Sequence, residues 1–291
     1  MIEFRNVYAS YNPQIPILKN VSFTVNDGDF VAFVGTNGAG KSTTMRLMNG
    51  LLKPDQGEVL IDGTPTTELK TSEMARRVGY LFQNPDHQIC CNTVREELMF
   101  GFKALGIHTA EAEERVDKII AEFGFNPSDD PFLLNRGTRQ LLALASIIVM
   151  ELPVIILDEP TTGLDFRECI KVMEIVKRLH EQGTTVVMVC HDMEVVADYA
   201  KRVIAMTHGR LVADGETFEV LRDAVTLATA DLIPPQATAL SMGLVDAHPS
   251  LAATDLASAN TIEALEEAFV SYVNALPGNA YEASSEQGQG E

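Results

Sequence analysis

A glycine-rich segment directly after a short apolar run constrains this chain more than any other feature. Residues 35–42 read GTNGAGKS, which matches the pattern G-x-x-x-x-G-K-[ST] in full, and they follow the apolar run FVAFV at residues 30–34. A near-continuous apolar run of this length is typical of a buried parallel strand. The segment therefore predicts a strand, a loop whose backbone amides point at phosphate, and a helix whose N-terminus faces the same phosphate.

Each position of this segment has an expected role toward a bound nucleotide. The glycines allow the backbone to wrap closely around phosphate groups. Lys41 is expected to reach the β- and γ-phosphates, Ser42 to ligate Mg²⁺, and Thr43 to add a phosphate contact. A glycine-rich turn with a chance lysine is the alternative, and the strand before it and helix after it disfavour that interpretation. The residues expected to contact ATP here are Gly35, Asn37, Gly38, Gly40, Lys41, Ser42 and Thr43.

A second apolar run, VIIL at residues 154–157, ends in two acidic residues. An acid at the end of a buried strand is costly unless it acts on a cation, so Asp158 is expected to hold Mg²⁺ through water. Glu159 lies one residue further and is the candidate general base for an attacking water. Two adjacent carboxylates also fit a surface turn, but the apolar strand in front of them argues against it.

The order of strands and helices predicts an α/β fold. A third apolar run, residues 184–189, precedes Cys190, His191 and Asp192, and a helical pattern over residues 167–182 lies between the second and third runs. Ligands of such folds bind at the carboxyl ends of the strands. The loops that carry chemistry should therefore meet at one edge of the sheet.

The remaining segments suggest a division of the chain. Alternating apolar residues near the N-terminus predict antiparallel strands, and a mainly helical insert is expected over about 84–150. The chain contains no Lys or Arg after Arg222. We therefore predict a nucleotide-binding domain over 1–222, a C-terminal extension over 223–276, and a disordered polar tail over 277–291.

Composition limits the possible partners. The formal net charge of −19 among 291 residues argues against a nucleic-acid surface, which needs basic patches. The four cysteines form no CxxC pair and have no histidine at metal-ligand spacing, so ordinary reduced thiols are expected. The most apolar stretch, residues 141–157, is interrupted by Glu151 and Pro153 and is too short to span a bilayer. Any membrane role is therefore expected to go through a partner.

Further motifs give the chain a family resemblance. Residues 1 to about 222 resemble the ABC ATPases. The order and spacing of that family are matched by Tyr11, Gln83 in VGYLFQNPDHQ, Asp165 in DEPTTGLD, and His191. A lone histidine or tyrosine is more often structural, but the set together is specific. The resemblance implies a P-loop cassette with a RecA-like parallel core, an N-terminal antiparallel β subdomain and a helical insert.

The same resemblance assigns roles to these residues. Gln83 would act in catalysis and at the Mg²⁺ ion, and His191 would contact the γ-phosphate. Asp165 would lie near the nucleotide, and Tyr11 would stack on adenine. ATP and Mg²⁺ are the implied cofactors.

The segments FQNPDHQ, HDMEVVADYAKRVIAMTHGRLVADG and PPQATAL are similar to the ATPase subunits of energy-coupling factor (ECF) transporters, the cobalt- and vitamin-uptake type. This resemblance implies a second ATPase chain, a transmembrane coupling protein received by residues 84–100, and a small membrane substrate-binding protein. It also implies a location at the cytoplasmic face of the membrane and a dimerising C-terminal extension. The alternatives are a soluble, non-transport ABC ATPase and a regulatory cassette with weak hydrolysis.

One motif departs from the family pattern. The usual signature LSGGQ is replaced here by Leu134-Asn135-Arg136-Gly137-Thr138. The resemblance implies that Asn135 and Gly137 face the γ-phosphate of ATP bound by the other chain. Arg136 replaces a glycine, so its backbone must avoid positive φ or accept strain of about 1 kcal/mol, and its guanidinium would add charge near that ATP. We expect the second ATPase to be a different chain with a more usual signature, while an identical partner with a working variant signature stays open.

Overall fold

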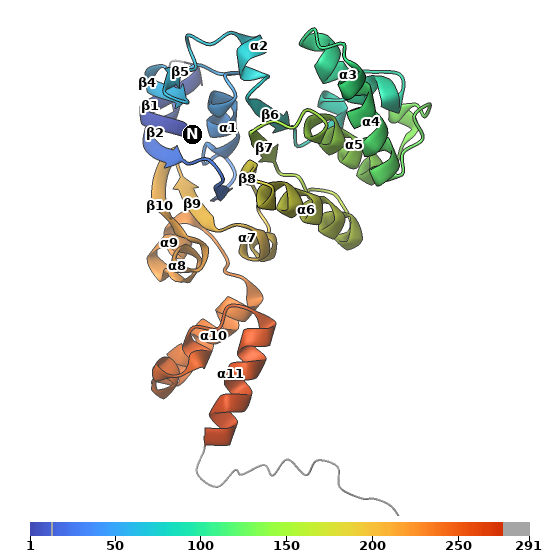
Figure 1. Cartoon of the computed structure of the whole chain (residues 1–291). Coiled ribbons are helices and arrows are strands. Elements are labelled where there is room, and N and C mark those ends of the chain that lie inside the picture. Colours follow the sequence, from blue (N-terminus) through green and yellow to red (C-terminus); the bar gives the residue numbers. More distant parts are fainter. Residues whose placement is uncertain (13, 276–291) are drawn as a thin grey trace, which may run out of the picture. The chain divides into compact units, whose positions relative to one another are not determined.

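The structure is a computed structural model that describes residues 1–12 and 14–275. Two compact units divide the chain, Met1–Leu232 and Ile233 onward. The first unit contains both β-sheets and the loops singled out by the sequence motifs (Figure 1). In the described residues, no helix combines the length and the apolar character that crossing a bilayer requires.

The N-terminal strands form a four-stranded sheet in the order β2-β1-β4-β5, and all of its pairings are antiparallel. Ile2 pairs with Val25 on one side and with Ile61 on the other. The Phe4 and Phe23 rings stack inside this sheet, with ring centroids 4.4 Å apart. The antiparallel subdomain predicted from the alternating sequence is therefore confirmed. The strands are β1 (Ile2–Asn12), β2 (Ile15–Val25), β4 (Gln56–Ile61) and β5 (Thr64–Pro65).

The second sheet has six strands in the order β10-β9-β3-β8-β7-β6. Its pairings from β9 to β6 are parallel, and only β10 joins antiparallel to β9. The three apolar runs predicted as strands are the neighbouring strands β3, β8 and β7, which confirms the α/β prediction. The strands are β3 (Phe30–Val34), β6 (Val78–Leu81), β7 (Val154–Asp158), β8 (Thr185–Val189), β9 (Arg202–Thr207) and β10 (Arg210–Glu216).

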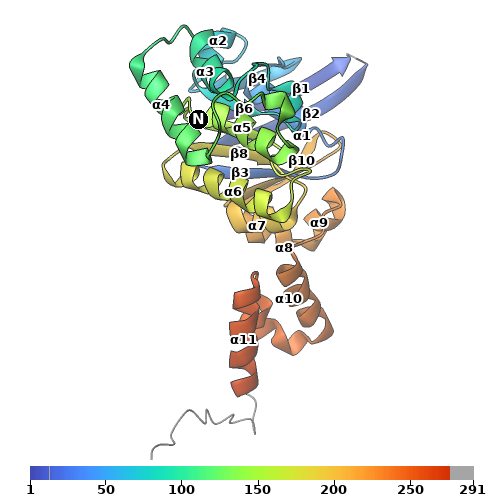
Figure 2. The ribbon, with the colours of Figure 1, turned by 90° about the vertical axis from the view of Figure 1, so that its right-hand side faces the viewer.

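Both faces of the six-stranded sheet are covered, which explains why its strands lack alternation. Val31 and Phe33 of β3 face a core that also contains α1 (Lys41–Met48) and the antiparallel sheet. Phe30, Ala32 and Val34 face the opposite core, which contains α6 (Phe166–Glu181) and α7 (Met193–Tyr199) (Figure 2). The carboxyl ends of the strands are thus held rigidly between two packed layers.

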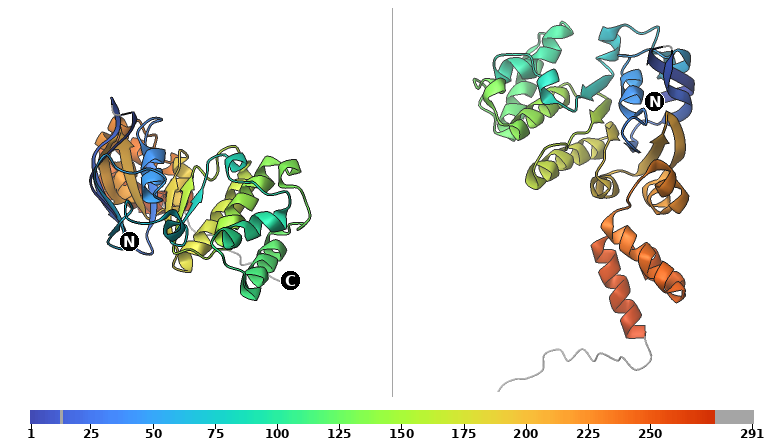
Figure 3. Two further views of the ribbon diagram at one scale, coloured as in Figure 1. Left: turned by 90° about the horizontal axis from the view of Figure 1, so that it is seen from above. Right: turned by 180° about the vertical axis from the view of Figure 1, so that it is seen from behind.

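The chain between β6 and β7 is mainly helical, and Figure 3 shows its helices grouped together away from the antiparallel sheet. α4 buries Val116, Ile119 and Phe123 on one face; Thr109 caps its N-terminus, and Gly124 in the left-handed region ends it. The elements are η1 (Pro85–His87), α3 (Val94–Ala104), α4 (Ala110–Phe123), η2 (Pro131–Leu133) and α5 (Arg136–Ile148), and the short α2 (Thr71–Met74) precedes β6.

The first compact unit extends past the domain boundary predicted at 222/223. α8 (Thr217–Arg222) and α9 (Ala224–Ala230) both belong to the first unit, which ends at Leu232. Ala230 is fully buried in the core beside the six-stranded sheet, and Leu232 packs against that core. The absence of Lys and Arg after Arg222 reflects a change in charge along the chain. The end of the first unit is set instead by the apolar packing of residues up to Leu232.

The second unit contains α10 (Gln236–Ala247), η3 (Pro249–Ala253), η4 (Asp255–Ala257) and α11 (Ile262–Ala275). Leu251, Leu256 and Ala268 form its small core. The buried Ser241 hydroxyl donates to the Leu256 carbonyl oxygen at 2.6 Å, which ties α10 to η4. The tail predicted over 277–291 lies outside the described residues. Large apolar side chains remain exposed in this unit at Ile233, Leu240, Ile262, Phe269 and Val270.

Candidate active site

The glycine-rich loop joins β3 to α1 in a backbone conformation that requires glycine. Gly35 has φ 133°, and a Cβ at this position would lie 2.0 Å from the backbone oxygen of Met206 on β9. Gly40 has φ 103°, and a Cβ there would meet the Leu18 side chain at 2.6 Å. Since α1 begins at Lys41, the loop leads directly into a helix N-terminus, which favours anions.

Lys41 folds back across the loop. Its side-chain nitrogen Nζ donates to the carbonyl oxygens of Gly35 at 2.7 Å and Thr36 at 2.9 Å, and only 5% of the residue is exposed. Burial lowers the pKa of Lys41, while the charges of Glu159 and Asp158 oppose that shift. The ammonium group therefore holds the loop in its wrapped shape and needs an anionic partner to offset its lost hydration.

Asp158, the last residue of β7, is buried beside the start of α1. Its Oδ1 accepts from the Ser42 hydroxyl at 3.1 Å, and its Oδ2 accepts from the Tyr80 hydroxyl at 2.8 Å. Burial raises the pKa of this carboxyl group, whereas the two hydroxyl donors lower it. A carboxylate and a hydroxyl at one point form the all-oxygen donor set that Mg²⁺ prefers. The sequence motifs did not identify Tyr80 as a site residue. It lies on β6, which pairs with β7, and this pairing brings its hydroxyl group to Asp158.

Glu159 has φ 54°, in the left-handed region, where a non-glycine residue costs on the order of 1–3 kcal/mol. Its backbone N–H donates to the Val189 carbonyl oxygen of β8 at 3.1 Å. Its Oε2 accepts from Gln83 Nε2 at 2.7 Å and from the Thr162 hydroxyl at 3.0 Å, while Oε1 lies 3.0 Å from His191 Nε2. The strained backbone thus presents a carboxylate whose two oxygens are both engaged by neighbouring side chains.

The two halves of the site meet in one cavity of ≈ 330 Å³. Residues of the glycine-rich loop and of α1 line one part, and Glu159 and His191 line the other. Gln83 is joined to this cavity through its hydrogen bond to Glu159. The hydrogen-bond donors and acceptors of this cavity fit a magnesium-bound nucleoside triphosphate. The lining residues are Ile17, Asn37, Gly38, Gly40, Lys41, Ser42, Thr43, Glu159 and His191.

Tyr11 lies apart from this cavity. It is 56% exposed and is not among the described residues that line the cavity, where Ile17 of β2 is found instead. The Tyr11 hydroxyl accepts from Arg46 Nη1 at 2.8 Å, and the Arg46 guanidinium lies 5.8 Å from the ring centroid. Stacking of Tyr11 on adenine therefore stays a prediction, and Ile17 is a lining residue that the motifs did not reveal.

The altered signature lies at the N-terminus of α5. Asn135 is the N-cap, and its side-chain oxygen accepts from the Thr138 N–H at 2.9 Å. Arg136 is the first residue of α5, so its backbone is helical and the positive φ considered for it does not occur. Its Nη2 donates to the Thr162 carbonyl oxygen at 3.1 Å, and its guanidinium packs on Gly163. The guanidinium thus contacts the loop after β7 of its own chain.

Gly137 of the signature is buried in the first turn of α5, and Asp165 lies at the N-terminus of α6. A Cβ on Gly137 would lie 1.7 Å from the Glu168 carboxylate, so a larger residue at this position would require the Glu168 side chain to move. Asp165 caps α6: its carboxylate accepts from the Glu168 N–H at 2.9 Å, and Glu168 Oε2 accepts from the Asp165 N–H at 3.0 Å. The residues that the resemblance assigns to another chain's ATP therefore lie together, and none of them lines the ≈ 330 Å³ cavity.

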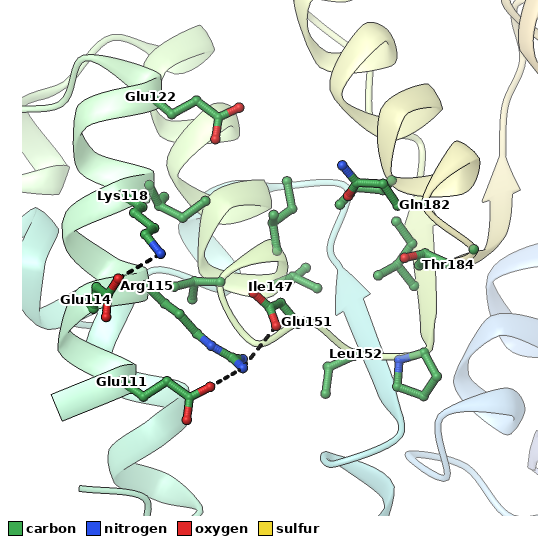
Figure 4. Close-up of a pocket in the computed structure, with 17 residues that line it drawn as sticks. Glu111, Glu114, Arg115, Lys118, Glu122, Ile147, Glu151, Leu152, Gln182 and Thr184 are labelled. Atoms are coloured by element: carbon green, nitrogen blue, oxygen red, sulfur yellow. Dashed lines mark hydrogen bonds and ion pairs between the residues drawn. The ribbon is translucent and has the colours of Figure 1, made fainter. Parts of the chain in front are cut away.

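A larger cavity of ≈ 680 Å³ lies between α4, the end of α5 and the end of α6 (Figure 4). Arg115 crosses it, pairing with Glu111 at 2.7 Å and with Glu151 at 3.0 Å. The other charged pair within this cavity is Lys118 with Glu114, and Glu122 pairs with Arg178 outside it. None of these residues belongs to the motifs described above. We therefore place the chemistry in the smaller cavity.

Comparison with known proteins identifies the family. Residues 18–162 match the family described as ABC transporter. The chain is 38% identical over 240 residues to the energy-coupling factor transporter ATP-binding protein EcfA of Methanothermobacter thermautotrophicus, a match that spans 81% of this chain and 77% of that protein. The chain belongs to the ABC transporter ATP-binding proteins. Members of this family are ATPases that use ATP with Mg²⁺, and the resemblance to ECF subunits drawn from the motifs is confirmed.

Other matches differ in length. The chain is 40% identical over 244 residues to a putative ABC transporter ATP-binding protein of Caldanaerobacter subterraneus, a match that spans 83% of this chain but only 43% of that relative's length. Among solved structures, cbiO1 of Clostridium perfringens, part of the ABC transporter complex cbiONQ, superimposes with a TM-score of 0.69 at 27% identity, over 86% of this chain and 96% of that one. An ATP-binding cassette solved as a dimer with ADP and Pi gives 0.68 at 29% identity, over 75% of this chain and 99% of that one.

Proposed function

We propose that this ABC ATPase is the motor subunit of an ECF-type importer, and that it couples ATP binding and hydrolysis to uptake of a vitamin or a transition-metal ion. The observation that carries the proposal is the ≈ 330 Å³ cavity, where the phosphate loop faces Glu159 and His191. The EcfA and cbiO1 relatives support the importer assignment.

The proposed roles follow from the contacts of each side chain. Lys41 and the loop amides bind the phosphates, and Ser42 and Asp158 hold Mg²⁺ with help from Gln83. The metal ion neutralises the charge that develops on the phosphoryl oxygens. Glu159 accepts the proton of the attacking water, and for this one of its oxygens must leave its present hydrogen-bond partner.

His191 completes the proposed site by contacting the γ-phosphate. It lines the same cavity as the phosphate loop, and its Nε2 lies beside Glu159. Release of Glu159 from His191 would free the imidazole for that contact and the carboxylate for water. One hydrogen bond thus links the two proposed catalytic groups, and phosphate binding competes with it.

We further propose that the active assembly is a pair of ATPase chains at the cytoplasmic face of the membrane. Asn135, Gly137 and Asp165 of this chain would complete the site of its partner, which is supported by their positions at the N-termini of α5 and α6. A transmembrane coupling protein would dock on residues 84–100, and a membrane substrate-binding protein would complete the importer. Nucleic acid has no place in the proposed assembly.

The altered signature leads us to expect unequal sites in a heterodimer. The ATP site built on Lys41 and Glu159 of this chain would be closed by the partner's usual signature. The partner's ATP site would be closed by Asn135 and the variant signature of this chain, and it would hydrolyse ATP more slowly. In a reconstituted complex, Glu159→Gln should therefore remove most of the turnover, and the matching change in the partner should remove a minor part. Equal losses from the two changes would contradict unequal sites.

The second unit is expected to hold the ATPase pair together between closures of the nucleotide sites. Its exposed Ile262, Phe269 and Val270 offer apolar area to a partner. Truncation after Leu232 leaves the first unit intact, unlike truncation after Arg222, which would remove the buried Ala230. We expect light scattering of this chain mixed with its partner ATPase, without nucleotide, to give a dimer mass for the full chain and a monomer mass after truncation. An unchanged dimer, or a monomer in both cases, would count against this role.

The proposed function is tested by the composition of the complex. The tagged chain is purified from detergent-solubilised membranes, and the chains that remain bound are identified by mass spectrometry. The proposal predicts a second ATPase and two integral membrane proteins. The two membrane proteins should be lost when Phe100, an exposed residue of α3, is changed to Asp. Val225→Asp on α9, which makes the same change at another exposed apolar residue outside 84–100, is the control and should keep them. Recovery of the chain without membrane proteins would favour the soluble or regulatory alternatives.

A further inference from the structure

Two adjacent cysteines and a buried carboxylate lie together outside the candidate active site. Cys90, Cys91 and Glu97 each offer one ligand atom, and these atoms all lie within 4.8 Å of one another. Cys90 is exposed and Cys91 is half-buried, whereas only 2% of Glu97 is exposed. The spacing of the cysteines alone predicts ordinary thiols; it is the first turn of α3 that brings the third group to them.

The loop around Glu97 is shaped by this carboxylate. Thr93 caps α3, and Glu97 Oε2 accepts from the backbone N–H groups of Cys90 and Cys91, each at 2.9 Å. Both of these hydrogen bonds use the same oxygen. Among the described residues, no Lys, Arg or His forms an ion pair with Glu97. A buried anion held this way, beside two thiols, lacks the cation that usually offsets its lost hydration.

The chemistry of the three groups selects a class of ion. Thiolates favour Zn²⁺ and other thiophilic metals, while a carboxylate oxygen is a common additional ligand of Zn²⁺. Around a tetrahedral Zn²⁺ with Zn–S bonds of about 2.3 Å, two sulfur atoms lie about 3.8 Å apart. The three ligand atoms, which all lie within 4.8 Å of one another, are close to the spacing that such an ion requires.

We propose that Cys90, Cys91 and Glu97 form a binding site for a thiophilic divalent cation, best matched by Zn²⁺. Three ligands leave one tetrahedral position, which water fills in the isolated chain. The site is separate from the nucleotide cavity, because none of the three residues lines it. The three residues lie within 84–100, the segment on which the coupling protein is proposed to dock, so the site is tested in the isolated chain.

A redox or covalent role suits this pair less well. Burial, followed by the negative charge of Glu97, raises the pKa of the Cys91 thiol to about 12. Protonated thiols are poor nucleophiles at neutral pH. A bound cation would displace these protons, because the thiolate is the form that ligates metal.

The test uses Co²⁺ as a coloured substitute for Zn²⁺. The full chain is stripped with a chelator, kept reduced with a phosphine, and titrated with Co²⁺ in excess Mg²⁺, which occupies oxygen-only sites. We expect a thiolate-to-cobalt charge-transfer band that saturates at about one ion per chain and disappears when Zn²⁺ is added. Cys90→Ser/Cys91→Ser should lose the band, and Cys169→Ser/Cys190→Ala should keep it. No band in the wild type, or an equal band in both double variants, would overturn the site.

Glu97→Gln tests the third ligand. The amide oxygen of Gln can still accept from the two backbone N–H groups, so the loop should keep its fold, which circular dichroism checks. Loss of the carboxylate should weaken Zn²⁺ binding by more than about tenfold, since even outer partners of a metal site affect affinity on that scale. Unchanged Zn²⁺ affinity in this variant would contradict the three-residue site.

Discussion

Glu159→Gln is expected to bind ATP like the wild type and to lose hydrolysis by about 10²- to 10⁴-fold, the usual contribution of a general base. The phosphate loop and Lys41 do not contact the changed carboxylate by hydrogen bonds, and the Gln side chain can still bond to Gln83, Thr162 and His191. What the variant lacks is the basic oxygen that accepts a proton from water. Equilibrium binding of ATP and phosphate release, measured on the same preparation, separate the two effects.

The matched control for this variant is Glu181→Gln, which makes the same chemical change at an exposed position near the end of α6. It should leave both binding and hydrolysis unchanged. If Glu159→Gln turned over ATP within a few-fold of the wild type, the base would have to be another group.

Lys41→Ala is expected to act at an earlier step and to weaken ATP binding itself. The ammonium group bonds to two carbonyl oxygens of the loop and lies on the wall of the cavity. Charge-assisted hydrogen bonds contribute about 1.5–3 kcal/mol each, so loss of one phosphate contact predicts about 10- to 100-fold weaker binding. Titration with a fluorescent ATP analogue measures this affinity directly.

Lys53→Ala is the control for Lys41→Ala, because Lys53 is exposed and lies outside the cavity. Circular dichroism checks that both variants are folded. ATP affinity that stayed at the wild-type value in a folded Lys41→Ala protein would show that the phosphates bind elsewhere.

The strands that position the site were predictable because strands buried on both faces have near-continuous apolar sequences. The runs at 30–34, 154–157 and 184–189 are apolar on both faces, and the structure places helices or a second sheet against each face. The glycines of the phosphate loop were predictable for a related reason, since the close approach of Gly35 to β9 admits no side chain. Such local requirements are visible in a single sequence.

Side-chain contacts between segments far apart in the sequence were not predictable in this way. The hydrogen bonds of Tyr80 to Asp158 and of Thr162 to Glu159 depend on how separate segments meet at the sheet edge. The left-handed backbone of Glu159 is likewise imposed by its surroundings, because glutamate has no intrinsic preference for it. Spacing along the chain does not encode these relations.

Arg136 illustrates the same limit within a motif. Its place in the signature predicts a charge near another chain's ATP, and the structure adds a hydrogen bond from its guanidinium to the Thr162 carbonyl oxygen of its own chain, which the motif did not indicate. Thr162 lies three residues after Glu159, in the loop that leads to α6. The substitution therefore ties the signature helix to the loop that carries the proposed base.

The central claim is that this chain hydrolyses ATP as part of a membrane complex, and hydrolysis by that complex tests it most directly. The complex captured through a tag on the chain is placed in lipid discs, and phosphate release is measured with wild-type Lys41 and with Lys41→Ala. We predict that the wild-type complex contains membrane proteins and hydrolyses ATP, and that most of this activity is lost in the variant. Phosphate release that is absent from the wild-type complex, or equal in the two complexes, would contradict the claim.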